Sequence, residues 1–218
     1  MIKNWYCLCI AVIIWLICMW LTMPFPNALN TEQGVTVLNV LIKTNDGYQI
    51  EGLVTILLLS ISLYYFVYAV KKYQILLFFV IIVSFVYMPI LIVNAYQNTL
   101  ATGIHAVFYD IDKSECKFKL EDDYTLKGVC RLPLQNLSTE EVKFNLGFYE
   151  TYWYENDVRS VSLMNEGLPY EVRLTGKQKK WVKVETLIDV SQIENHIEKG
   201  TVSGVHIVII GGGQIRKL

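Results

Sequence analysis

Two long apolar stretches, residues 52–70 and 75–95, lie on either side of a short basic segment. Neither stretch contains a charged residue, and each is long enough to cross a lipid bilayer as an α-helix. Only residues 71–74, which include Lys71 and Lys72, join them. The two helices are therefore expected to form a tight antiparallel hairpin with a basic tip. This pattern favours a membrane protein over a soluble one.

A third apolar run covers residues 5–23, which as a helix is about 28 Å long at about 1.5 Å per residue. Trp5 and Trp20 lie near its ends, where amphipathic rings favour the lipid headgroups. Pro24 follows and ends the helix. A cleaved signal peptide is the alternative, because Lys3 precedes the apolar run. The segment after the run offers no small-x-small cleavage site, so an uncleaved helix is favoured.

The distribution of lysines predicts the orientation. Lys3, Lys71 and Lys72 flank the apolar runs on one side, whereas the loop of residues 24–51 contains only Lys43. Basic residues in short loops tend to stay in the cytoplasm. We therefore predict a multi-pass protein of the cell membrane with a cytoplasmic N-terminus. Three spans then place the loop 24–51 and the whole C-terminal part outside.

Charge divides the chain into two parts of different composition. Residues 1–100 carry four basic and three acidic residues, whereas residues 101–218 carry fifteen basic and seventeen acidic ones. The sequence therefore predicts a membrane domain over residues 1–97 and an extracytoplasmic domain over residues 98–218. The second part is long enough to form a core of its own. Its charges are mixed in sign without a basic run, which argues against nucleic-acid binding.

Apolar residues alternate with polar ones on both sides of an acidic turn at residues 121–123. This period of two predicts a β-hairpin. Folding it about Asp123 pairs Leu120 with Leu126 and brings Cys116 opposite Cys130 on the same face. The sequence therefore predicts a disulfide between these two cysteines, which would persist outside the cytoplasm. A pair of buried thiols is the alternative.

Further alternating segments predict more strands, at residues 142–148, 161–163, 168–174, 182–188 and 204–210. About seven short strands at regular spacing are typical of an antiparallel β-sandwich, immunoglobulin-like in its architecture. A capping-box pattern that begins at Ser191 predicts a short helix over residues 191–199. The glycines 211–213 near the C-terminus are interpreted as a flexible tail rather than a phosphate-binding loop.

Candidate reactive groups are few. The three histidines, His105, His196 and His206, are not spaced as metal ligands, and no cysteine pair has metal-binding spacing. We therefore predict no catalytic residue, no metal site and no cofactor.

An aromatic segment provides the candidate interaction surface, which consists of Tyr149, Tyr152, Trp153 and Tyr154. Both faces of a strand there carry aromatic rings, and only one face can enter a core. Exposed Tyr and Trp side chains favour recognition. The alternative is that the segment packs on the loop 24–51 or at the membrane surface.

These features predict a non-catalytic protein. The helices anchor it in the lipid bilayer, and its outer domain binds a protein partner in the membrane or on its outer face, or serves as an accessory subunit. The alternative is a transport-associated or immunity-type membrane protein whose helices act with a permease.

Overall fold

The computed structural model describes residues 2–26, 34–38, 40–44, 47–150, 159–193 and 195–218. The chain forms two compact units. One consists of Met1–Phe25 and Glu32–Ala95, and the other of Pro26–Thr31 and Tyr96–Leu218.

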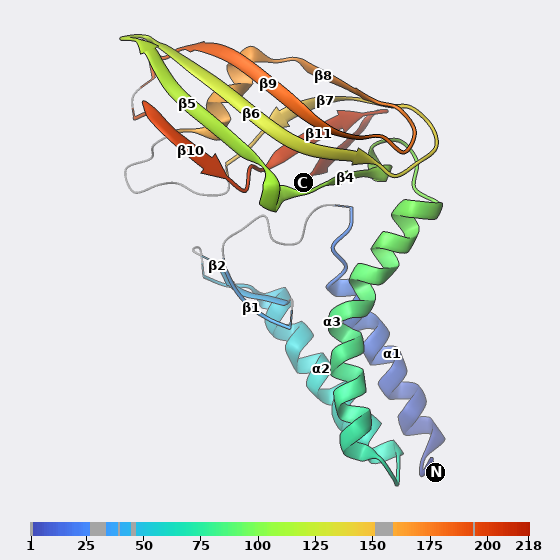
Figure 1. Ribbon diagram of the computed structural model, residues 1–218. Coiled ribbons are helices and arrows are strands. Elements are labelled where there is room, and N and C mark those ends of the chain that lie inside the picture. The colour runs from blue at the N-terminus through green and yellow to red at the C-terminus, as the bar shows by residue number, and fades with distance from the viewer. Residues whose placement is uncertain (1, 27–33, 39, 45–46, 151–158, 194) are drawn as a thin grey trace. The chain divides into compact units, whose positions relative to one another are not determined.

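Three apolar helices, α1 (Trp5–Leu21), α2 (Ile50–Ala69) and α3 (Gln74–Thr99), form the first unit, except for the last residues of α3, which belong to the second (Figure 1). By length and composition α2 and α3 are able to cross a membrane, whereas α1 has 17 residues and is shorter. Asn4 caps α1, because its side chain accepts a hydrogen bond from the backbone N–H of Tyr6 at 3.1 Å. The structure therefore contains helices at all three apolar runs.

Helices α1 and α2 pack against each other in antiparallel directions. The backbone N–H of Lys3, just before α1, donates to the carbonyl of Ala69 at the end of α2, at 2.7 Å. Between the helices, the buried Ser62 hydroxyl donates to the carbonyl of Ala11 at 2.9 Å. Small polar residues of this kind let apolar helices approach closely and bond across the interface. Helix α3 joins the other two through buried Ile81 and Phe85.

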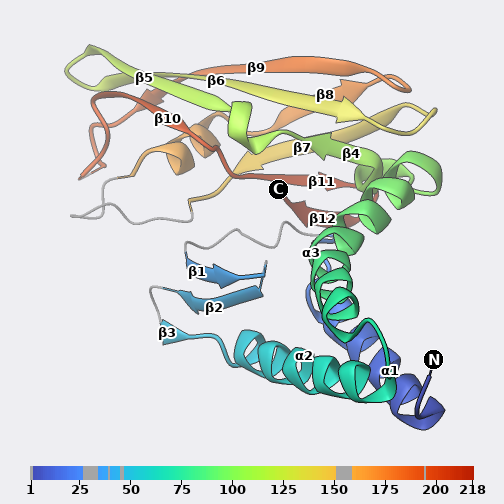
Figure 2. The same cartoon turned by 60° about the horizontal axis from the view of Figure 1, so that its bottom comes forward.

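A small antiparallel sheet connects α1 to α2. It consists of β1 (Gly34–Val37), β2 (Val40–Thr44) and β3 (Gly47–Tyr48) (Figure 2). Val40 is buried in a cluster with Leu59 of α2. At Gly52 a Cβ atom would lie 1.9 Å from the carbonyl oxygen of Leu41, so only glycine allows this close approach. This part of the loop thus forms strands, and β2 packs on α2.

The second unit contains two antiparallel sheets. The strands of the first sheet are β4 (Val107–Tyr109), β5 (Glu115–Asp122), β6 (Thr125–Asn136), β9 (Lys179–Asp189) and β10 (Lys199–Ser203). Their order in the sheet is β10-β5-β6-β4, and β9 also pairs with β6. The second sheet has the order β12-β11-β7-β8, and its strands are β7 (Val142–Phe148), β8 (Tyr170–Leu174), β11 (Ile207–Gly211) and β12 (Gln214–Lys217).

The two sheets lie as two layers around one hydrophobic core (Figures 1 and 2). Phe118 and Leu132 enter it from the first sheet, and Phe144, Leu146 and Ile209 enter it from the second. Strand residues between these positions point away from the core, as the period of two requires. Helices and antiparallel sheets are therefore both present, as the sequence predicts.

The predicted hairpin is confirmed at the level of single residues. Strands β5 and β6 pair Leu120 with Leu126 and Cys116 with Cys130. The two cysteines form a disulfide, with their Cα atoms 4.0 Å apart. At the turn, the carboxylate of Asp122 accepts a hydrogen bond from the backbone N–H of Thr125 at 2.8 Å.

The predicted secondary structure is wrong for two segments. Residues 161–163 belong to the 3-10 helix η3 (Val161–Gly167) rather than to a strand. The described part of residues 191–199 contains no helix. After β9 the chain makes a turn, in which the Ile193 N–H donates to the Val190 carbonyl at 3.1 Å. Strand β10 then begins at Lys199. The partly buried Ile193 and Ile197 pack on the core. Tertiary contacts there outweigh the local helix signal.

The predicted C-terminal tail is also wrong, because the glycines form a hairpin turn. Gly212 and Gly213 have φ angles of 59° and 75°, and they connect β11 to β12. Positive φ at both central residues defines the two-residue turn that suits the twist of antiparallel strands. Ile210 then pairs with Ile215, so the last residues complete the second sheet.

Candidate functional site

The candidate interaction surface begins where β7 ends. Tyr149 is the first of its residues, whereas Tyr152, Trp153 and Tyr154 lie outside the described residues. Tyr149 is half-buried, and its hydroxyl donates to the carbonyl of Leu218 at 3.4 Å. Its ring therefore packs along the C-terminus of the chain.

Burial controls the protonation of the groups around Tyr149. It raises the pKa of Tyr149 to about 12, so the phenol stays neutral. The ring centroid of His206 lies 5.4 Å away, and burial lowers the pKa of this histidine, which favours the neutral imidazole. Among the described residues no group bonds to the buried Nδ1 of His206. The predicted strand over residues 204–210 includes His206, whereas the observed strand β11 begins directly after His206, at Ile207.

A cavity of about 370 Å³ lies beside Tyr149. Its lining combines aromatic, apolar and charged side chains, from Phe148, Tyr149, Glu150, Arg159, Ser162, Leu163 and Glu166. Size and lining suit a small polar group or a side chain of a partner.

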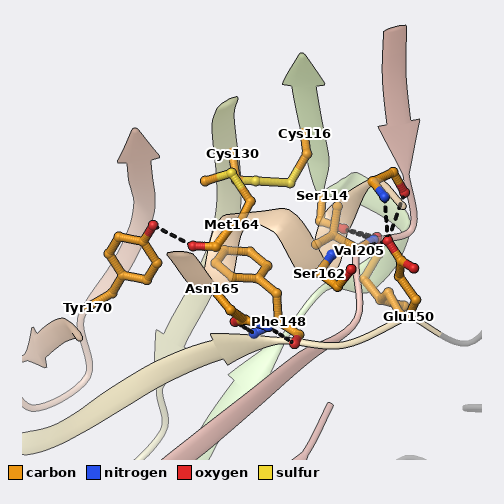
Figure 3. Close-up of a disulfide and its surroundings, with 12 residues drawn as sticks. Ser114, Cys116, Cys130, Phe148, Glu150, Ser162, Met164, Asn165, Tyr170 and Val205 are labelled. Carbon is orange, nitrogen blue, oxygen red and sulfur yellow. Dashed lines mark hydrogen bonds between the residues drawn. A yellow bond between two sulfur atoms is a disulfide. The ribbon is translucent and has the colours of Figure 1, made fainter. Parts of the chain in front are cut away.

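Glu150 fixes one wall of this cavity. Its carboxylate accepts hydrogen bonds from the backbone N–H groups of Ser160 at 2.6 Å and Ser162 at 3.1 Å (Figure 3). The Ser160 hydroxyl donates to the same oxygen at 3.2 Å. The carboxylate therefore caps the start of η3, and this oxygen is occupied by structural bonds rather than poised as a base.

Two further side chains hold η3 against the second sheet. The amide of Asn165 bonds to both backbone groups of Phe148, donating at 2.8 Å and accepting at 2.9 Å. The hydroxyl of Tyr170 donates to the carbonyl of Met164 at 2.6 Å (Figure 3). The sequence did not identify Glu150 or Asn165 as structurally important. Asn165 precedes Glu166-Gly167, a pattern that suggests only an ordinary turn.

The disulfide lies beside Met164 of η3 (Figure 3). A Cβ atom at Gly128 of β6 would lie 2.4 Å from the sulfur of Met164, which shows how closely η3 approaches the first sheet. Cys116 and Cys130 are fully buried. The bridge therefore joins two strands inside the core and is a structural element of this unit.

A third missed residue is Arg216 of β12, which is buried although it is charged. Its Nη1 group donates to the carbonyl of Ile104 at 3.0 Å, inside the 3-10 helix η1 (Gly103–Ala106), and to the carbonyl of Val107 at 2.7 Å, directly after it. Burial lowers its pKa to about 10, so the guanidinium remains charged at neutral pH. It joins β12 to η1 within the second unit, which is called the β unit below.

The predicted topology determinants are brought together in the helical unit. Ile2 forms a β-bridge with Val70, which directly precedes Lys71 and Lys72. The Nζ of Lys3 lies 4.2 Å from the ring centroid of Tyr68. All three lysines therefore lie at one end of the α1–α2 pair.

Comparisons with known protein families, with curated proteins and with solved structures found no match. Within the described residues, no group of three His, Cys, Asp or Glu side chains is placed to hold a metal ion. The function is therefore argued from the geometry of the two units.

Proposed function

We propose that this chain is a membrane-anchored, non-catalytic interaction or accessory protein. Its three helices span the cell membrane with the N-terminus in the cytoplasm. The β unit is a sandwich of immunoglobulin-like architecture that binds a protein partner outside. The observation that carries the proposal is the position of Lys3, Lys71 and Lys72 at one end of the α1–α2 pair.

The helices support the anchoring role. Exposed aromatic rings gather at the end that carries the lysines, where Trp5, Tyr6 and Tyr73 are all more than half exposed. Trp20 is exposed at the opposite end of α1. Such rings favour the two headgroup regions. Helix α1 is about 26 Å long at about 1.5 Å per residue, close to a hydrocarbon thickness of about 30 Å.

The β unit supports a binding role. It has its own core and a disulfide, which persists in an oxidising compartment. Tyr149, the first residue of the aromatic segment, lines the cavity, and Glu150 in its wall holds η3 in place. These features provide a stable shape for recognition, in which the aromatic segment supplies the contacts.

The test is cross-linking of intact cells with a lysine-reactive reagent that does not cross membranes. The wild-type chain is expected to yield a specific cross-linked partner. The double variant Trp153→Ala, Tyr154→Ala should lose most of this product. The exposed pair Ile210→Ala, Ile215→Ala on β11 and β12 serves as the matched control and should retain it.

Each contrary result has its own meaning. Labelling of the β unit only after the cells are permeabilised would overturn the orientation. An unchanged product in the Trp153 and Tyr154 variant would remove the aromatic segment from the binding surface. Capture of a permease through the helices alone would favour a transport-associated role.

A further inference from the structure

The outward face of the first sheet, formed by β10, β5, β6, β9 and β4, is basic within a unit that is acidic overall. Its basic residues are Lys117, Lys119, Lys127, Arg131, Lys179, Lys183 and Lys199. Its acidic residues are Glu115, Glu121, Asp122, Glu185 and Asp189. The other positions of residues 101–218 carry eight basic and twelve acidic residues. Positive charge is therefore concentrated on one face, where it creates an attractive potential for anions.

Three of these lysines form a row across neighbouring strands. Lys199 of β10 pairs with Lys119 of β5, which pairs with Lys127 of β6. Adjacent strands are about 4.8 Å apart, so the three lysine side chains project from the sheet close to one another. Like charges directly opposite one another oppose sheet pairing. A bound anionic surface would remove this repulsion.

Acidic neighbours neutralise only part of the face. Glu185 lies 2.8 Å from Lys127, and Glu115 lies 3.2 Å from Lys117. Among the described residues, no carboxylate forms an ion pair with Lys119 or Lys199, both of which are exposed. These two ammonium groups are therefore available to an external anion.

Large apolar side chains are exposed on the same face. Phe108, Trp181 and Leu187 are 41%, 54% and 61% exposed. Leu187 continues the lysine row, because it pairs with Lys127. Cationic side chains mixed with exposed Trp, Phe and Leu are typical of surfaces that lie in the headgroup region of a bilayer.

We propose that this face binds the anionic headgroups of a lipid bilayer, with its lysines on the phosphates and its apolar side chains among the headgroups. The inference rests on the proposed membrane anchor, because helices that hold the chain at a bilayer keep these lipids at high local concentration. A second copy of the chain fits poorly, since its same face would bring lysines against lysines. A soluble polyanion would leave the apolar side chains exposed to water.

The experiment uses the full chain in lipid nanodiscs, either of neutral phosphatidylcholine or with added phosphatidylglycerol. A soluble acylating reagent modifies exposed lysines, and mass spectrometry follows each site. Acylation of Lys119 and Lys199 is expected to slow at least about fivefold in the anionic discs and to recover in high salt, because salt screens the attraction to anionic lipids. Lys143, exposed on the second sheet, should react at the same rate in both discs.

Two charge variants sharpen the test. Lys119→Glu with Lys199→Glu should abolish the protection of Lys183, whereas Lys143→Glu with Arg173→Glu on the second sheet should leave it intact. Equal acylation rates in a chain that has inserted into both discs would overturn this inference while leaving the anchor standing. Failure to insert would instead contradict the anchor. Protection by added polyphosphate in neutral discs, without protection by anionic lipid, would identify a soluble polyanion and also overturn the inference.

Discussion

Individual polar residues in the interior of the β unit are tied to backbone groups far away in the sequence. The Ser114 hydroxyl accepts a hydrogen bond from the Val205 N–H at 2.7 Å, and the Tyr109 hydroxyl donates to the Val205 carbonyl at 2.6 Å. Arg216 bonds to the carbonyls of Ile104 and Val107 in the same way. Buried polar groups contribute to stability only when they are paired, so these contacts specify one arrangement of the chain.

Replacing the buried arginine tests this principle. Arg216→Met should lower the free energy of unfolding of the β unit by about 3 kcal/mol, because the carbonyls around η1 lose a charged donor. Arg173→Met removes the same group from an exposed position of β8 and should change little. Chemical denaturation of the full chain in detergent compares the two variants. Equal stability would show that the guanidinium contributes no net stabilisation.

Elements with a strong local signal are predictable from sequence. The β5–β6 hairpin is one, because its alternation and acidic turn lie within about twenty residues of chain. Elements that depend on distant partners are not. η3 forms where Glu150 bonds to its first residues and where its own Asn165 bonds to the backbone of Phe148. The predicted helix after Ser191 gives way to a turn leading to β10. The C-terminal glycines form a turn because β11 already pairs with β7, which offers the last residues a sheet to extend.

The glycine turn gives a prediction at this scale. Gly212→Ala with Gly213→Ala should destabilise the β11–β12 hairpin by about 1–2 kcal/mol for each residue, because an L-residue is strained at positive φ. Gly212→Asn should be nearly neutral, since Asn-Gly suits the same turn. Thermal unfolding of the full chain measures both. A stable double alanine variant would mean that the turn has another conformation.

The whole molecule consists of two units with separate cores. The core of the β unit draws its residues from positions 104–218, and the helical clusters draw theirs from positions 8–85. Each unit therefore has its own source of stability, and a change in one core need not weaken the other.

The disulfide tests this independence. Cys116→Ser should destabilise the β unit by about 2–4 kcal/mol, because the bridge closes a loop with a sequence separation of 14. Hydrogen exchange should accelerate in peptides from β5 and β6 and stay unchanged in peptides from α2. Cys9→Ser, which removes an exposed free thiol of α1, is the control. Identical exchange with and without reductant would show that the bridge is not formed.

The sequence by itself determined the apolar helices, the change in composition after them and the register that brings Cys116 to Cys130. These features follow from length, hydropathy and a period of two, which act over short stretches of chain. Only the tertiary structure decided the position of Lys3 beside Lys71 and Lys72, the form of η3 and the role of Arg216. Each of these depends on contacts between distant segments, because the bonding partners of a buried polar group are chosen only when the chain has folded.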